Sequence, residues 1–122
     1  ALKKAVYQPL LHGDFVAIEG FAQLTKTIPL TNFSSSVLDE SGEQLCPMKW
    51  STVQTTYQKS ESPELLPFGC FATAYYSELL TAYGFTPRSA KILAVEKIED
   101  QDVSIALGVA VYENWRGKIS PI

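Results

Sequence analysis

His12 is the only histidine among the 122 residues, so any mechanism that uses histidine as a general base must use this one. Asp14, two residues further on, could orient its imidazole ring. The alternative is a solvated turn residue, because a histidine beside Gly13 between two predicted strands has the composition of a tight turn. His12 is therefore a candidate catalytic residue, and the turn position is the favoured interpretation.

Cys70 and Glu78 are the other candidate catalytic residues, and both lie in a segment predicted to be helical. Near a helix N-terminus, Cys70 would feel a field that favours the reactive thiolate, and it could pair with His12 across the fold. The apolar sequence around Cys70 favours a buried structural cysteine instead. Burial of Glu78 would favour the protonated form of a general acid, whereas an exposed helix face would leave it solvated.

Three tyrosines of the same segment could line a pocket, since each offers an apolar ring and a hydroxyl group. They are Tyr75, Tyr76 and Tyr83, and core packing is their alternative role.

The chain carries no glycine-rich phosphate loop, dinucleotide fingerprint, nucleophile elbow or histidine-rich metal site. We therefore expect no cofactor and no metal, and the sequence argues against ATP-driven chemistry.

Charge and hydropathy restrict the partners and the compartment. Ten basic and thirteen acidic residues give a net charge of -3, which does not suit binding to nucleic acid. No uncharged stretch, 103–112 included, is long enough to span a membrane. The first residues do not resemble a signal peptide, although one already removed would leave no trace. These features predict a cytoplasmic protein that contacts neither nucleic acid nor membrane.

The two cysteines, Cys46 and Cys70, are too few for the disulfide framework of a small secreted domain. Two buried, reduced thiols are the expected state. A single disulfide between them is the alternative if the chain is exported.

The length of the chain indicates one compact domain, 1–122, of the α+β class. Its fold is predicted as an antiparallel sheet of about five or six strands, made from three hairpins, packed around one main apolar helix. The hairpins are expected to join residues 5–11 with 16–28, 36–38 with a strand from 45, and 90–98 with 103–112. Residues 50–59, rich in Thr and Gln, suit an edge strand.

The helix is expected at about residues 68–83, where apolar side chains recur at helical spacing. Gly84 predicts a left-handed C-terminal cap, with Phe85 folding back and Pro87 preventing continuation. The aromatic face should meet the core, and a narrow stripe of Thr73, Ser77 and Thr81 should face outward. A helix so nearly apolar all round is expected to be wrapped by the sheet.

Without catalytic motifs, the sequence favours a non-catalytic binding or protein-interaction module and makes an enzyme the less favoured class. Self-association is expected, because the second face of the predicted strand 103–112 is uncharged and lacks a cover. The alternative is a pocket for a small apolar ligand between the sheet and the tyrosine-rich helix. His12, Cys70, Glu78 and Tyr75 would converge there, for ligand carriage or simple acid–base catalysis.

Overall fold

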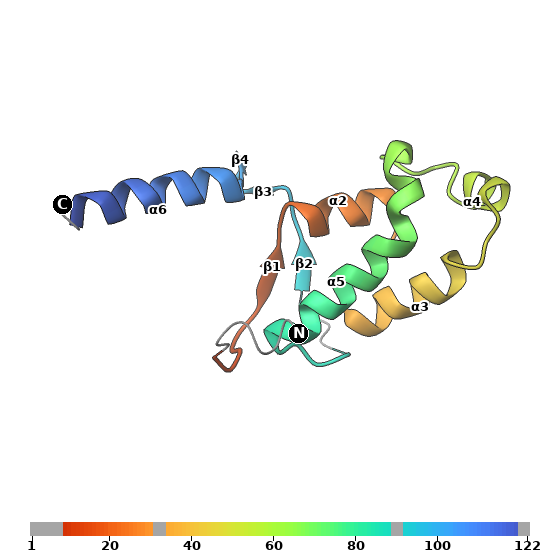
Figure 1. Cartoon of the computed structure of the whole chain (residues 1–122), viewed down its shortest axis with the longest axis horizontal. Helices are drawn as coiled ribbons and strands as arrows, with labels where there is room; N and C mark the ends of the chain where they lie inside the picture. The colour runs from red at the N-terminus through yellow and green to blue at the C-terminus, as the bar shows by residue number, and fades with distance from the viewer. Residues whose placement is uncertain (1–8, 31–33, 89–91, 120–122) are drawn as a thin grey trace.

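The computed structural model describes residues 9–30, 34–88 and 92–119. A short strand leads into a group of helices, a second strand returns beside the first, and a last helix extends away from the rest (Figure 1). In chain order the elements are β1 (Phe15–Ala17), α2 (Gly20–Thr27), α3 (Ser35–Leu45), α4 (Trp50–Thr56), the 3-10 helix η1 (Pro63–Phe68), α5 (Gly69–Tyr83), β2 (Ile92–Ala94), β3 (Lys97–Ile98), β4 (Gln101–Asp102) and α6 (Ile105–Ile119).

The predicted antiparallel sheet of five or six strands is wrong. The described residues are mostly helical, and their strands form two separate two-stranded sheets. β1 and β2 run parallel, with Phe15 opposite Ile92 and Ala17 opposite Ala94. Parallel strands need a long crossover connection, and the helices between β1 and β2 form it.

The predicted strand 16–28 ends at Ala17, and most of its remainder is α2. Its partner, 5–11, lies outside the described residues up to residue 8 and is not a strand from residue 9 onward. The period-two pattern failed here because Leu24 and Ile28 are also one helical turn apart. Both are buried, so the apolar residues assigned to a strand face form the inner side of α2 and its C-cap.

The second predicted hairpin is a single helix, α3. The hydroxyl of Ser34 accepts a hydrogen bond from the backbone N–H of Val37 at 3.3 Å, which is the N-cap that starts this helix. The polar run 39–43, between the two strands predicted for this hairpin, lies inside the helix. The predicted edge strand 50–59 is also helical over α4, where Val53 is the buried residue.

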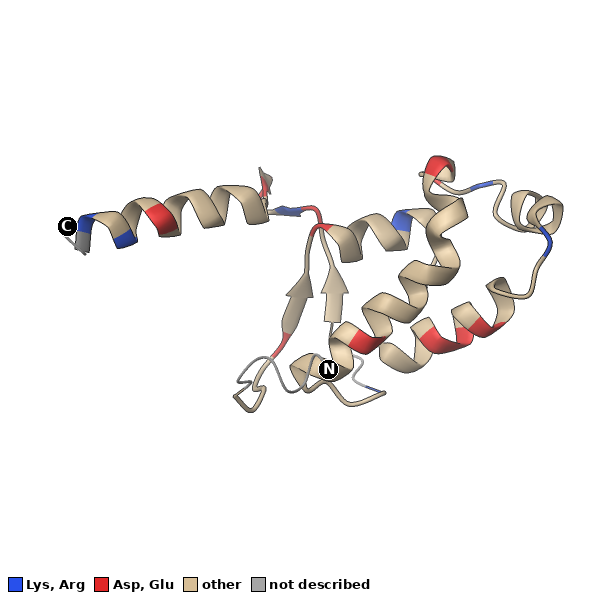
Figure 2. Cartoon of the chain, viewed as in Figure 1, with Lys and Arg blue, Asp and Glu red and all other residues tan. Residues whose placement is uncertain are grey.

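The predicted apolar helix forms as α5, and it ends as expected. Gly84 adopts the left-handed conformation with φ 98°, and the N–H of Phe85 donates to the carbonyl oxygen of Leu80 at 3.1 Å. Apart from Glu78, α5 carries no charged residue (Figure 2).

The orientation predicted for α5 is wrong. Thr73 is 1% exposed and Ser77 is buried, whereas Phe71 is 70% exposed. Small side chains let α3 approach closely: a Cβ on Gly42 would lie 2.8 Å from the Thr73 Oγ1. Ser77 donates a hydrogen bond to Asp39 Oδ1 at 2.5 Å, which satisfies its buried hydroxyl. The close contact of α3 with α5 therefore uses the polar stripe and leaves much of the aromatic face uncovered.

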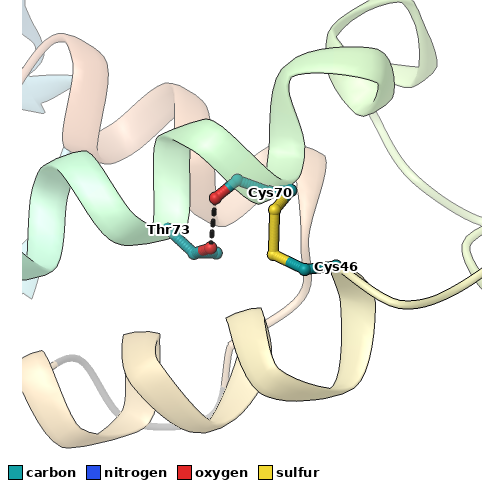
Figure 3. The surroundings of a disulfide bond; sticks show 3 residues. All are labelled: Cys46, Cys70 and Thr73. Atoms are coloured by element: carbon teal, nitrogen blue, oxygen red, sulfur yellow. Dashed lines mark hydrogen bonds between the residues drawn. A yellow bond between two sulfur atoms is a disulfide. The ribbon is translucent and has the colours of Figure 1, made fainter.

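A disulfide joins Cys46, directly after α3, to Cys70 in the first turn of α5, with their Cα atoms 5.0 Å apart (Figure 3). The prediction of two reduced thiols is therefore wrong. The carbonyl oxygen of Cys70 accepts a hydrogen bond from Thr73 Oγ1 at 2.9 Å. The disulfide therefore links α3 to α5 covalently at the end of their shared interface.

Of the third predicted hairpin, 90–98 with 103–112, only the end of the first strand pairs in a hairpin, and it pairs with residues 101–102 instead of 103–112. Glu99 and Asp100 have positive φ values of 51° and 64°, and they connect the two-residue strands β3 and β4. The segment predicted as the second strand is mostly α6, whose alternating large and small residues resembled a strand pattern. Its uncharged face therefore gives no sheet surface for a second subunit. Of the helices in the described ranges, none combines the length and apolar character that crossing a bilayer requires.

Candidate functional site

The structure does not bring the three candidate catalytic residues together. His12 is exposed in the loop before β1, and Glu78 is exposed on α5. Cys70 is held in the disulfide and has no free thiol. Within the described ranges, no hydrogen bond or ion pair joins any two of them, so the proposed dyad of His12 and Cys70 is not formed.

The three candidate tyrosines border one groove between β1, β2 and α5, which we call the tyrosine groove. It has a volume of about 490 Å³ and a mainly apolar wall that includes Tyr75, Tyr76 and Tyr83. Glu19 also borders it. The pocket expected against an antiparallel sheet is therefore not formed as predicted: of His12, Cys70, Glu78 and Tyr75, only Tyr75 borders the groove, and a ligand-binding role for the groove stays a prediction.

A smaller cavity of about 170 Å³ lies between α2, η1 and the start of α5, and we call it the Gln23 cavity. Its lining comprises Gly20, Gln23, Leu24 and Thr27 from α2, Leu65 and Phe68 from η1, and Gly69, Ala72 and Tyr76 from α5. Phe68 is 63% exposed, so much of its side chain is uncovered. Tyr76 borders this cavity as well as the tyrosine groove.

The Gln23 side chain is held in place by a chain of hydrogen bonds. Its Nε2 donates to the Oγ of Ser62 at 2.9 Å, and Ser62 is 5% exposed. The N–H of Ser62 donates to Ser60 Oγ at 3.3 Å, and Ser60 Oγ donates to the carbonyl oxygen of Thr27 at 2.7 Å. Because Thr27 ends the helix that carries Gln23, the chain of bonds returns to α2.

The lining of the Gln23 cavity contains no charged residue. Acidic side chains border the other cavities that we compare: Glu19 in the tyrosine groove, Glu96 and Asp102 in a cavity beside β3 and β4, and Asp39 in one beside α3. Gln23 also borders the cavity beside β3 and β4. The Gln23 cavity therefore has no lining carboxylate that would repel a bound anion.

The side chain of Tyr76, which is uncharged, borders both the tyrosine groove and the Gln23 cavity. Burial raises the pKa of its phenol above the ordinary value of 10.0, and electrostatic repulsion from Tyr75 adds to the rise. In the described part of the chain, no three His, Cys, Asp or Glu side chains are grouped closely enough to hold a metal ion.

Gln23 was missed as a site residue because α2 was predicted to be a strand. In a strand, Gln23 points away from Leu24. In a helix, Gly20, Gln23 and Thr27 follow the spacing of one face, and this face meets α5. Reading the segment at a period of 3.6 would have placed these three residues together.

The model of the GDA1/CD39 (nucleoside phosphatase) family matches residues 3–119. The ectonucleoside triphosphate diphosphohydrolase 1 of Bos taurus is 32% identical over 108 residues. That alignment covers 84% of this chain and 21% of the relative, so the chain spans about a fifth of the length of the relative.

These matches overturn the expected non-catalytic interaction module. The sequence was taken to argue against ATP-driven chemistry because it has no glycine-rich phosphate loop, yet such a loop is one of several ways to bind a nucleotide. The match extends over nearly the whole sequence. The chain belongs to the GDA1/CD39 (nucleoside phosphatase) family.

Proposed function

We propose that this chain supplies the nucleobase-binding part of a nucleoside phosphatase, with the base in the Gln23 cavity. The observation that carries the proposal is the form of this cavity, which is apolar, free of charged residues and bordered by one anchored amide. Small-molecule sites usually combine a mainly apolar wall with a few fixed polar groups.

The size of the cavity suits a single ring system. Its volume of about 170 Å³ is close to that of an engineered apolar cavity of roughly 150 Å³ that binds benzene. Phe68 offers a ring for stacking, an interaction worth about 1–3 kcal/mol per base. The sugar and phosphates would then lie outside the cavity.

The proposal concerns binding of the nucleotide. Phosphoryl transfer depends on cationic groups or metal ions that stabilise the charge on the transferring phosphate. No metal-binding group of acidic, histidine or cysteine side chains occurs in ranges 9–30, 34–88 and 92–119. We assign to these residues the holding of the base.

We also propose that the chain functions in an oxidising compartment. Structural disulfides persist outside the reducing cytosol, and the bond between Cys46 and Cys70 is of this kind. The name of the Bos taurus relative, ectonucleoside triphosphate diphosphohydrolase 1, agrees with this proposal. It replaces the cytoplasmic location expected from the sequence.

Calorimetric titration of the purified chain with ATP, adenosine and ribose 5-phosphate tests the proposal. ATP and adenosine should bind, and ribose 5-phosphate, which has no base, should not. Phe68→Ala should weaken adenosine binding about tenfold, because it removes the stacking ring. Phe71→Ala is the matched control, since Phe71 is a similarly exposed ring outside the cavity lining. Equal losses in the two variants, or no binding of adenosine, would overturn the proposal.

A further inference from the structure

We infer that Gln23 selects for bases that carry an N–H donor. This inference rests on the proposed function, because it assigns a recognition role within the same cavity. Stacking on Phe68 can hold any flat ring, whereas a fixed amide can distinguish rings by the hydrogen-bonding groups on their edges.

The amide of Gln23 has unused hydrogen-bonding capacity. A glutamine side chain offers two N–H donors and an oxygen with two lone pairs. One N–H is donated to Ser62, and no described residue donates a hydrogen bond to Oε1. The oxygen is therefore available to a donor on a bound base.

The orientation of this amide is set before a base arrives. Ser62 is nearly buried and is itself tied through Ser60 to the carbonyl oxygen of Thr27, at the end of α2. Thr27 Oγ1 in turn donates to the backbone oxygen of Gln23 at 2.9 Å. A side chain fixed by such supporting bonds loses little conformational freedom when it binds a ligand.

The energetic consequence is selectivity against bases without a donor. A base that enters the cavity removes water from the Gln23 oxygen, and a base without an N–H leaves that oxygen unsatisfied in apolar surroundings. Such a base should bind about ten- to a hundredfold more weakly. Adenine, guanine, cytosine and uracil each present at least one N–H, so the same amide accommodates all four.

The test compares ATP with purine riboside triphosphate, which differs from ATP only by the absence of the exocyclic amine. This change makes the base smaller, so weaker binding cannot come from a steric clash. In the unmodified chain, calorimetry should give the ten- to hundredfold preference for ATP. Gln23→Met, which removes the acceptor at similar size, should bring the two affinities together. Gln54→Met, on α4 and outside the cavity, should keep the preference.

The outcomes separate this inference from the proposed function. If neither triphosphate binds, the proposed function fails. If both bind equally to the unmodified chain, the proposed function stands and the role of Gln23 is overturned.

Ser62→Ala provides a second variant in case Gln23→Met does not fold. It frees the amide to rotate and should reduce the preference, and an unchanged preference would contradict the anchoring role of Ser62.

Discussion

The phenol of Tyr76 lies directly against Gly20. A Cβ added at Gly20 would overlap the hydroxyl oxygen of Tyr76 and would lie 2.8 Å from its Cζ. The Tyr76 ring also contacts Phe21, with ring centroids 4.6 Å apart. Since Tyr76 borders both the tyrosine groove and the Gln23 cavity, Gly20 sets the position of the wall that the two spaces share.

Gly20→Ala should move the Tyr76 ring and destabilise the chain. An added methyl group in a filled space costs about 1–3 kcal/mol, because neighbouring side chains must leave their preferred positions. Urea denaturation should show this decrease in the free energy of unfolding. Adenosine binding should also weaken, because the displaced ring borders the Gln23 cavity.

Gly108→Ala is the matched control for this substitution. Gly108 lies in α6, and nothing stands within 4 Å of an added Cβ. Alanine favours a helix over glycine, so this variant should be as stable as the unmodified chain or up to about 1 kcal/mol more stable. Two variants of equal stability would show that Tyr76 is not packed on Gly20.

Alkaline pH should destabilise the fold through Tyr76. Burial raises the pKa of this phenol above 10.0. Below pH 10.0 the folded and unfolded chains both keep the proton, so the contribution of Tyr76 to the free energy of unfolding is fully present. Above that pH the unfolded chain loses its proton first, and the free energy of unfolding falls as the pH approaches the raised pKa. Denaturation across this range should show a smaller fall for Tyr76→Phe.

Part of the decrease in the free energy of unfolding at alkaline pH should remain in Tyr76→Phe. Burial also raises the pKa of Tyr57, and a hydrogen bond to Glu96 raises the pKa of Lys26. The stability that each of these groups contributes is therefore also lost as the pH rises. Tyr57→Phe should therefore reduce the fall as well. An identical pH profile for Tyr76→Phe and the unmodified chain would mean that the phenol is solvated.

The helix α5 could be predicted from sequence because its signals act locally. Gly84 stops the helix through its own backbone conformation, and the hydrogen bond of Phe85 is made to the adjoining turn. The buried face of α5 could not be predicted in this way. It depends on the approach of α3, which brings Gly42 against Thr73 across more than thirty positions of sequence. Hydrophobicity alone then selects the wrong side of the helix.

The contact between Gly42 and Thr73 can be tested by a double-mutant cycle. Gly42→Ala alone should destabilise the chain by about 1–3 kcal/mol, since its Cβ would lie 2.8 Å from the Thr73 Oγ1. In the Thr73→Ala background this oxygen is absent, and the cost should shrink. Urea denaturation of the four proteins gives the coupling between the two sites. Strictly additive effects would place Thr73 on the exposed side of α5, as the sequence pattern had suggested.

The candidate site shows a similar division between local and long-range signals. Tyr75, Tyr76 and Tyr83 were singled out by their type, and they border one groove. Gln23 was missed because its role depends on Ser62, which lies thirty-nine positions away. No local pattern reveals such a pair until the intervening helices have been placed.

The disulfide between Cys46 and Cys70 should contribute about 3 kcal/mol to stability, because it closes a loop with a sequence separation of 24 and so restricts the unfolded chain. The variant with Cys46→Ser and Cys70→Ser should unfold at a correspondingly lower urea concentration.

Both residues are exposed, so dithiothreitol should reduce the bond without prior unfolding and bring the unmodified chain close to the double variant. The double variant itself should not respond to dithiothreitol. If the unmodified chain were equally unresponsive, its thiols would already be reduced, and the proposed oxidising compartment would lose its support.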